Sequence, residues 1–210
     1  MPYPTAAEFR DLLRTRPLEE LVQGYIFQGE PFAFRSERRA LEVLYRHLHQ
    51  ELNLEPDQLT IVGSAKIGFS VSPESFPRRF SPTSDIDVVA VNEALYDEIW
   101  CTILKWHYPR RRRLLDPERT WARYRKDELY WGWIAPDRIR FDVVTLPEIL
   151  RPIHRLSARW FNAFRSLSRY HHFAGRHISG RLYRTWEHAR LYHVDSLRQL
   201  AESLHAQAGA

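Results

Sequence analysis

Apolar side chains recur at helical spacing along several parts of the chain. Between residues 36 and 53 they form one stripe, made of Leu41, Leu44, Tyr45 and Leu48. This pattern is typical of an amphipathic helix that packs on a core. Helices are predicted on this basis at residues 5–15, 36–53, 93–107, 158–173 and 179–207. Asn92 is a candidate N-cap for the third helix, and Gly175 and Gly180 interrupt the helical pattern between the last two.

Three short apolar segments are predicted as strands, because β-branched residues in them are flanked by turn residues. They are residues 58–63 (QLTIVG), 85–91 (DIDVVAV) and 138–146 (RIRFDVVTL). Helices, a few strands and then helices predict an α+β fold with a small mixed β-sheet flanked by helices. We expect residues 1–150 to form the domain with the sheet and the N-terminal helices. Residues 151–210 are expected to form a helical C-terminal region packed on that domain.

Composition excludes several classes of protein. A hydrophobic content of 44% over 210 residues is enough for a real core. No apolar run approaches the ~20 residues of a membrane span, and the N-terminus has no signal-peptide core, so we expect a cytoplasmic protein without a membrane partner. The single cysteine, Cys101, excludes an intramolecular disulfide and a cysteine-based zinc cluster.

The formal net charge is +5, and arginine supplies nearly all of the basic residues. The planar guanidinium suits phosphate, so a basic chain of this kind can bind nucleotides or nucleic acid. A compositional bias of the genome would produce the same arginine content, and the sequence does not decide between the two. Arg110–Arg113, followed by several aromatic residues, could bind single-stranded nucleic acid by stacking over a charged groove. Those aromatic residues could instead face a core, and we favour that alternative for them.

Two aspartates mark the start of the second predicted strand. Strand side chains alternate between faces, so Asp85 and Asp87 point the same way. Two like charges in this position repel each other. The pair is therefore expected either at an exposed strand end or beside a multivalent cation. Carboxylate oxygens at this spacing suit Mg²⁺, which shares its remaining positions with water and substrate phosphates.

A third carboxylate and a Gly-Ser pair extend this site. Asp142 is the only acidic residue in the predicted strand 138–146. If that strand lies beside the one with Asp85 and Asp87, three carboxylates converge, as two-metal catalysis requires. Gly63 leaves room for a phosphate near the backbone, and Ser64 adds a hydroxyl. Lys66 supplies a positive charge in reach of a phosphate.

The chain carries three motifs in order: an apolar residue with Gly-Ser, then "DIDV", then "FDVV". This order resembles the active-site signature of the DNA polymerase β-like nucleotidyltransferase superfamily, in particular its minimal domains. The resemblance covers about residues 59–145 and implies a nucleotidyltransferase-like fold. It also implies transfer of a nucleoside monophosphate from a nucleoside triphosphate to an acceptor hydroxyl of RNA, protein or a small molecule, with release of pyrophosphate. Asp85, Asp87 and Asp142 match the catalytic residues that bind Mg²⁺ or Mn²⁺. The predicted nucleotide-binding group is Gly63, Ser64, Lys66 and Ser84.

One departure from the superfamily pattern concerns spacing. Twenty residues (85 − 64 − 1) separate Ser64 from Asp85, about twice the usual number. The excess is a Pro- and Ser-rich segment that could be a lid over the nucleotide or a passive insertion. A catalytically silent partner or nucleic-acid-binding module with the same fold, as in toxin–antitoxin or defence systems, is the alternative function. The C-terminal histidines show no metal-ligand spacing, and the adjacent His171 and His172 are expected to point apart.

Overall fold

The computed structural model describes residues 3–141, 145–173 and 175–208. The helices are α1 Ala6–Thr15, α2 Leu18–Leu21, α3 Arg38–Leu52, α4 Ser64–Ile67, α5 Glu93–His107, α6 Asp116–Tyr130, α7 Arg151–Leu167 and α8 Trp186–Ala208. The strands are β1 Leu59–Val62, β2 Ile86–Val91, β3 Trp133–Ile134 and β4 Ile178–Tyr183. None of the helices in this described part combines the length and apolar character needed to cross a membrane. The predicted α+β fold with a small mixed sheet is confirmed.

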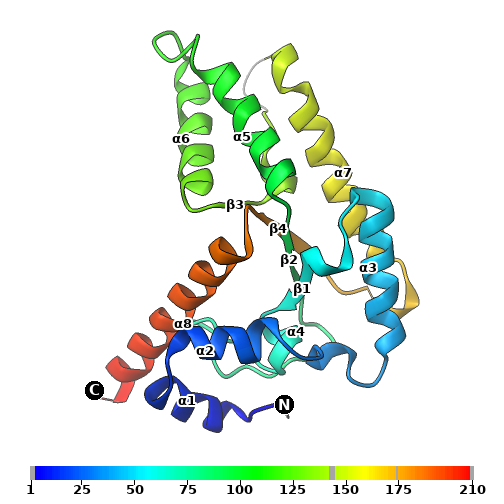
Figure 1. Ribbon diagram of the computed structural model, residues 1–210, viewed down its shortest axis with the longest axis vertical. Helices are drawn as coiled ribbons and strands as arrows, with labels where there is room; N and C mark the ends of the chain where they lie inside the picture. The colour runs from blue at the N-terminus through cyan, green and yellow to red at the C-terminus, as the bar shows by residue number, and fades with distance from the viewer. Residues whose placement is uncertain (1–2, 142–144, 174, 209–210) are drawn as a thin grey trace.

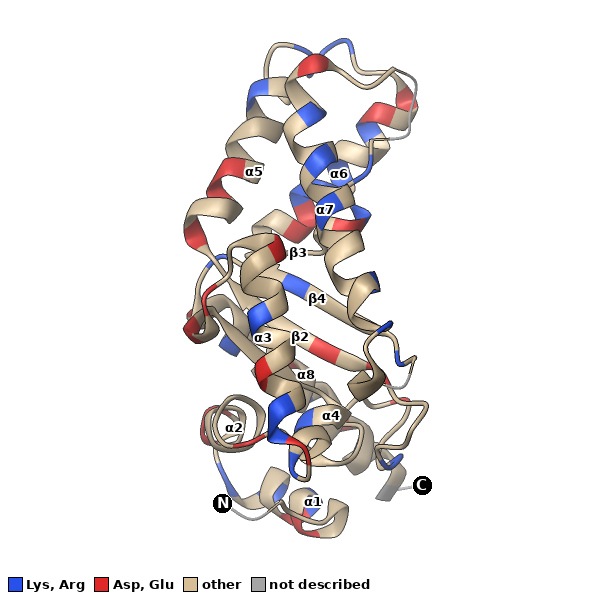
Figure 2. Ribbon diagram, turned by 90° about the vertical axis from the view of Figure 1, so that its right-hand side faces the viewer, with Lys and Arg blue, Asp and Glu red and all other residues tan. Residues whose placement is uncertain are grey.

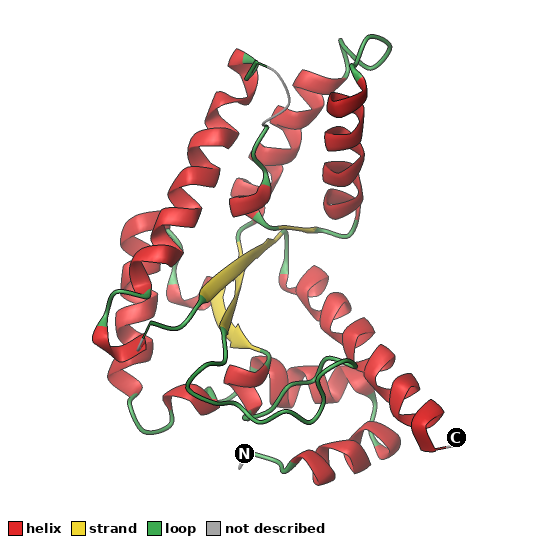
Figure 3. Cartoon of the chain, turned by 180° about the vertical axis from the view of Figure 1, so that it is seen from behind, coloured by secondary structure: helices red, strands yellow, loops and turns green. Residues whose placement is uncertain are grey.

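The four strands form one sheet in the order β1-β2-β4-β3. β2 runs antiparallel to β1 and parallel to β4, and the edge strand β3 runs antiparallel to β4. Figure 1 shows the sheet at the centre, with α5, α6 and α7 on one side and α1, α2 and α8 on the other. The same two groups of helices are seen on either side of the yellow strands from behind (Figure 3).

Each face of the sheet has its own hydrophobic core, because strand side chains alternate between faces. Ile61, Val88 and Leu182 belong to the core that α3, α5 and α7 cover. Val62, Val89 and Tyr183 belong to the other core, which also contains apolar residues of α1, α2 and α8. This alternation places the side chain of Asp87, two residues before Val89, on the same side of the sheet as α8.

The segment 179–183, predicted as the start of a helix, is instead strand β4. Ile178, Gly180 and Leu182 are buried on one face and alternate with Ser179, Arg181 and Tyr183. At Gly180 an added Cβ would lie 2.3 Å from the Phe164 ring, so the glycine permits α7 to pack directly on the strand. The glycine thus marks a close approach of backbone and side chain rather than a helix break.

The predicted strand 138–146 is also wrong for its described residues. Residues 138–141 and 145–146 are not in a strand, and Arg138 ends a 3₁₀ turn that begins at Pro136. Phe141 packs with its ring centroid 5.3 Å from that of Trp106 and 5.0 Å from that of Trp121. Phe141, one of the apolar residues that indicated a strand, therefore packs between α5 and α6. The neighbours of β2 in the sheet are β1 and β4.

Candidate functional site

The two aspartates of the predicted site lie at the N-terminal end of β2. Asp87 is the only exposed residue of this strand, since the other five are buried. Asp85, just before the strand, is also exposed. Figure 2 shows the acidic segment of β2 beside β4, which carries a basic segment. Two accessible carboxylates of like charge therefore lie two residues apart at the start of this strand.

Gly63 brings the end of β1 against this pair. In the antiparallel ladder Val62 is the partner of Asp87, so the turn after Val62 begins next to that carboxylate. Gly63 has φ +66° and ψ −149°, and a Cβ built on it would lie 3.3 Å from Asp87 Oδ2. Ser64 follows and is partly exposed. Gly63 and Asp87 thus lie side by side, with Ser64 next along the chain after Gly63.

Strand β4 adds residues that the sequence analysis did not include. Ser179 is paired in register with Asp87, and its hydroxyl donates to Asp87 Oδ1 at 3.1 Å. His177 Nδ1 lies 3.8 Å from Asp85 Oδ2. Two residues after Ser179, on the same face, the Arg181 guanidinium stacks over Trp133 and Tyr192. Alternating apolar residues in "HISGRLY" were the available signal, but it was hidden by the helical pattern that follows.

The environment of Asp87 favours its protonated form. Although the side chain is accessible, surrounding protein atoms remove part of its hydration, and this raises the pKa of Asp87 above its ordinary value. The Ser179 hydroxyl lowers the pKa, whereas the charge of Asp85 raises it. Arg181 and His177 lower it to a smaller degree. The net result is a carboxylate whose negative charge a bound cation would stabilise.

Lys66 lies in a different environment from the one that the motif suggested. It is buried, and its ammonium group donates to the backbone oxygens of Phe27, at 3.2 Å, and Gly29, at 2.6 Å. Burial lowers the pKa of Lys66 to about 8. The ammonium therefore ties the short helix α4 to the segment before α3, and in this arrangement it does not join the aspartate pair.

The long segment between Ser64 and Asp85 is folded against the body of the protein. Phe80 N donates to Gly68 O at 2.8 Å, and an isolated bridge joins Phe69 to Arg79. Arg176 donates to Ser81 O at 2.5 Å and to Ser84 O at 3.0 Å, and it lies over the Phe80 ring.

Ser84 is therefore held next to Asp85. Its own hydroxyl accepts a hydrogen bond from Ser81 N at 3.0 Å, which closes a turn. Asp142, the predicted third carboxylate, lies outside the described residues, so its place in the site stays a prediction.

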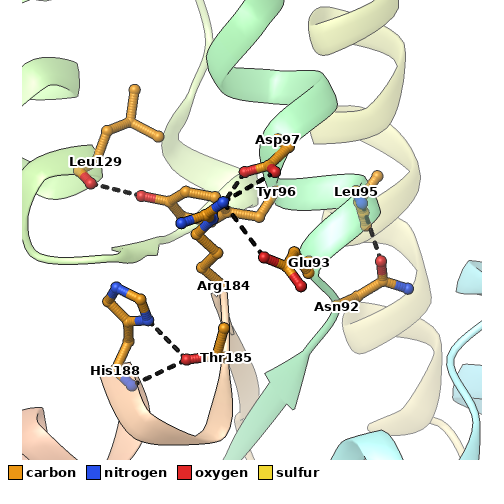
Figure 4. Close-up of polar contacts among 9 residues, drawn as sticks. All are labelled: Asn92, Glu93, Leu95, Tyr96, Asp97, Leu129, Arg184, Thr185 and His188. Carbon is orange, nitrogen blue, oxygen red and sulfur yellow. Dashed lines mark hydrogen bonds and ion pairs between the residues drawn. The ribbon is translucent and has the colours of Figure 1, made fainter.

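The opposite ends of β2 and β4 carry a second group of polar residues (Figure 4). Arg184 binds the Asp97 carboxylate through two hydrogen bonds, at 2.9 and 3.2 Å, and also lies 3.2 Å from Glu93. Beside it, α5 and α6 border a cavity of about 670 Å³. Its lining includes Trp100 and Lys126 and contains no Asp or Glu among the described residues. This cavity is lined by apolar and basic groups.

The arginine and aromatic residues that follow α5 in the sequence are partly buried in the core and partly exposed on the surface. Trp121 is buried against Trp106, with ring centroids 5.4 Å apart. Tyr124, Tyr130 and Trp131 are exposed. Arg110–Arg113 are exposed in the turn between α5 and α6. The preference for inward-facing aromatic residues is therefore confirmed for Trp121 and wrong for the three exposed ones.

Comparison with protein-family models, with curated proteins and with solved structures gives no match to this chain.

Proposed function

We propose that the protein is a divalent-metal-dependent nucleotidyltransferase. The observation that carries the proposal is the contact of the Gly63 turn with Asp87, one pleat from Asp85 on an accessible strand end. Few structural needs explain two carboxylates one pleat apart beside a glycine whose φ, +66°, residues with a side chain rarely adopt. A triphosphate with its cation needs such a place, where the backbone leaves room and carboxylates point outward.

The donor set fits Mg²⁺ or Mn²⁺, because it consists of accessible carboxylate oxygens that repel each other without a cation. Asp85 and Asp87 would hold the ion, with Asp142 as the predicted third ligand. When bound, the ion neutralises charge on the triphosphate and the leaving pyrophosphate. Ser179 fixes the orientation of the Asp87 carboxylate through its hydrogen bond. Gly63 and Ser64 would bind the phosphates.

In the proposed reaction an acceptor hydroxyl oxygen attacks the α-phosphorus of a nucleoside triphosphate. The bond from this phosphorus to the bridging oxygen of pyrophosphate breaks, and the hydroxyl proton leaves to a base or to water. Positioning and charge neutralisation provide most of the acceleration in transfers of this kind. The acceptor is an RNA end, a protein side chain or a small molecule, and the exposed arginines favour RNA.

The test is transfer of label from each α-labelled nucleoside triphosphate, with Mg²⁺ or Mn²⁺, to total RNA or cell extract. We expect a labelled product with the wild type and none with Asp87→Asn. Asp57→Asn is the matched control, because Asp57 is an exposed aspartate in a turn away from the β2 pair. Equal labelling by Asp87→Asn and wild type would overturn the metal-site assignment. No labelling by any protein would overturn the proposal itself.

The turn between α5 and α6 favours a second candidate, a catalytically silent module that binds nucleic acid or a partner. Four consecutive exposed arginines stand there, and the helix that follows, α6, carries the exposed Tyr124. Such a module would bind single-stranded RNA with an affinity that falls as salt rises. Binding would persist in the Asp85→Asn/Asp87→Asn double variant, and neither this variant nor the wild type would transfer label. The same preparations therefore distinguish the two functions.

A further inference from the structure

Two segments far apart in the sequence meet beside the N-terminus of α3. One is Glu37, the residue before α3, and the other is the 3₁₀ turn His171–Phe173, which follows α7. Phe34 and Phe173 are both buried, and their ring centroids are 6.4 Å apart. Glu37 N donates to Phe34 O at 3.0 Å. Buried aromatic residues thus anchor both segments to the core, while the polar side chains remain near the surface.

The polar side chains of these segments converge. His172 Nδ1 lies 2.5 Å from Glu37 Oε1, and the ring centroids of His171 and His172 are 3.8 Å apart. One ligand atom from each of the three residues lies within 4.8 Å of the others. The expectation that adjacent histidines point apart is therefore wrong here. It assumed a helix through residue 173, whereas α7 ends at Leu167 and a 3₁₀ turn holds both rings.

We propose that Glu37, His171 and His172 form a binding site for a transition-metal cation of the Zn²⁺ class. A divalent cation binds both neutral rings and the carboxylate together. Two nitrogen donors and one carboxylate suit Zn²⁺, and three protein ligands leave a fourth tetrahedral position for water.

The geometry needs only a small adjustment. Tetrahedral ligands at about 2.0–2.1 Å from zinc lie roughly 3.4 Å from one another. In this structure His172 Nδ1 and Glu37 Oε1 are 2.5 Å apart, and one ligand atom from each of the three residues lies within 4.8 Å of the others, so these atoms need to shift by about 1 Å. The Glu37 side chain is 51% exposed and His171 is exposed, so both can move. His172, at 13% exposure, is the fixed member. Binding would link α3 to the segment that leads into β4.

This site differs in chemistry from the Asp85 and Asp87 pair. Nitrogen donors discriminate against Mg²⁺, which prefers oxygen ligands. The proposal therefore does not depend on nucleotidyl transfer. Zn²⁺ binding should survive an excess of Mg²⁺ and the Asp85→Asn/Asp87→Asn double variant.

The test is titration of the full chain with Zn²⁺, followed by calorimetry and thermal unfolding, with Co²⁺ as the spectroscopic probe. We expect one ion per chain, a higher Tm, and the visible absorption of tetrahedral Co²⁺. His171→Ala and Glu37→Gln should each weaken Zn²⁺ binding about tenfold or more. His205→Ala is the matched control, because His205 is exposed near the end of α8. Circular dichroism checks that each variant is folded.

The proposal is overturned if Zn²⁺ does not bind. It is also overturned if His171→Ala and Glu37→Gln bind Zn²⁺ as tightly as the control. Octahedral Co²⁺ spectra with unchanged affinity in the variants would place the ion on other side chains and would likewise overturn it.

Discussion

In the turn after β1, one residue meets both a backbone requirement and a requirement of the site. Gly63, with φ +66° and ψ −149°, occupies a region that residues with a side chain rarely adopt. A side chain at this position would also crowd Asp87 Oδ2. Glycine meets both requirements because it has no Cβ. A substitution here would therefore carry two separate costs, one in the backbone conformation and one in the space beside Asp87.

We predict that Gly63→Ala lowers the free energy of unfolding by about 1–3 kcal/mol and also weakens nucleotide binding. Gly175→Ala is the matched control, because Gly175 has φ +71° but nothing within 4 Å of an added Cβ. It should lose stability without losing nucleotide affinity. The measurements are urea unfolding and calorimetric titration with a triphosphate and Mg²⁺. Equal loss of affinity in both variants would show that Gly63 has no special relation to the site.

Asp87 should make the metal-free protein less stable at neutral pH. Its folded pKa is raised above the unfolded value, chiefly through lost hydration. Between these two pKa values the folded state binds more protons, so stability decreases as pH rises through this range. Above both values the penalty for the charged carboxylate is fully present.

We therefore predict that Asp87→Asn raises the Tm at pH 7 without a cation and has little effect at a pH below both values. The same variant should lose the rise in Tm that Mg²⁺ and nucleotide give the wild type. Thermal unfolding across pH measures both effects. A lower Tm for Asp87→Asn at pH 7, in a folded protein, would contradict the prediction.

A site residue could be predicted from sequence when its position depends mainly on residues close to it in the chain or on directly paired strands. Asp85, Asp87 and Gly63 are placed by two strands that pair directly, and strand alternation already puts the two carboxylates on one face. Lys66 has the right charge for a phosphate, but its direction depends on the carbonyls of Phe27 and Gly29, about forty positions earlier. Ser179 reaches Asp87 only through the parallel pairing of β2 and β4, which no local pattern specifies.

At the scale of elements, helices with a long apolar stripe were predicted well and short strands less well. α1, α3 and α5 agree with the prediction, and Asn92 Oδ1 accepts the expected capping bond from Leu95 N at 2.9 Å. β4 was missed because six residues of alternating pattern run directly into a 23-residue helix. Residues 138–141 were assigned to a strand because Ile139 and Phe141 are apolar. Residues buried against helices are as apolar as residues of a strand, so the apolar composition alone does not distinguish the two.

The long segment before Asp85 gives a prediction at this scale. Because Arg176 binds two of its backbone oxygens and covers Phe80, Arg176→Ala should release residues 80–85. We expect faster hydrogen exchange in that segment and a weaker apparent affinity for nucleotide, since Ser84 and Asp85 would be held less firmly. Arg169→Ala, at an exposed position, is the control. Unchanged exchange in the Arg176→Ala variant would show that the segment is anchored by its backbone bonds alone.

At the scale of the whole molecule, the charge distribution separates two regions. The aspartate pair lies at the N-terminal ends of β2 and β4. The arginine turn 110–113 follows the C-terminal end of α5, on the side of the sheet where α5, α6 and α7 lie. None of the ion pairs in the described part of the chain involves these four arginines. Four adjacent charges without acidic partners repel one another, and a polyanion would relieve that repulsion.

We predict that Arg111→Ala/Arg112→Ala weakens binding to single-stranded RNA and makes it less sensitive to salt. Removing two phosphate contacts should reduce the slope of log K against log salt by about 1.4, at ~0.7 per contact for single strands. Arg38→Ala/Arg39→Ala is the matched control, since this adjacent exposed pair starts α3. Fluorescence anisotropy with a labelled oligonucleotide at several salt concentrations measures both quantities. If the two double variants show the same slope, RNA does not contact the turn, and the arginines act only through the overall charge.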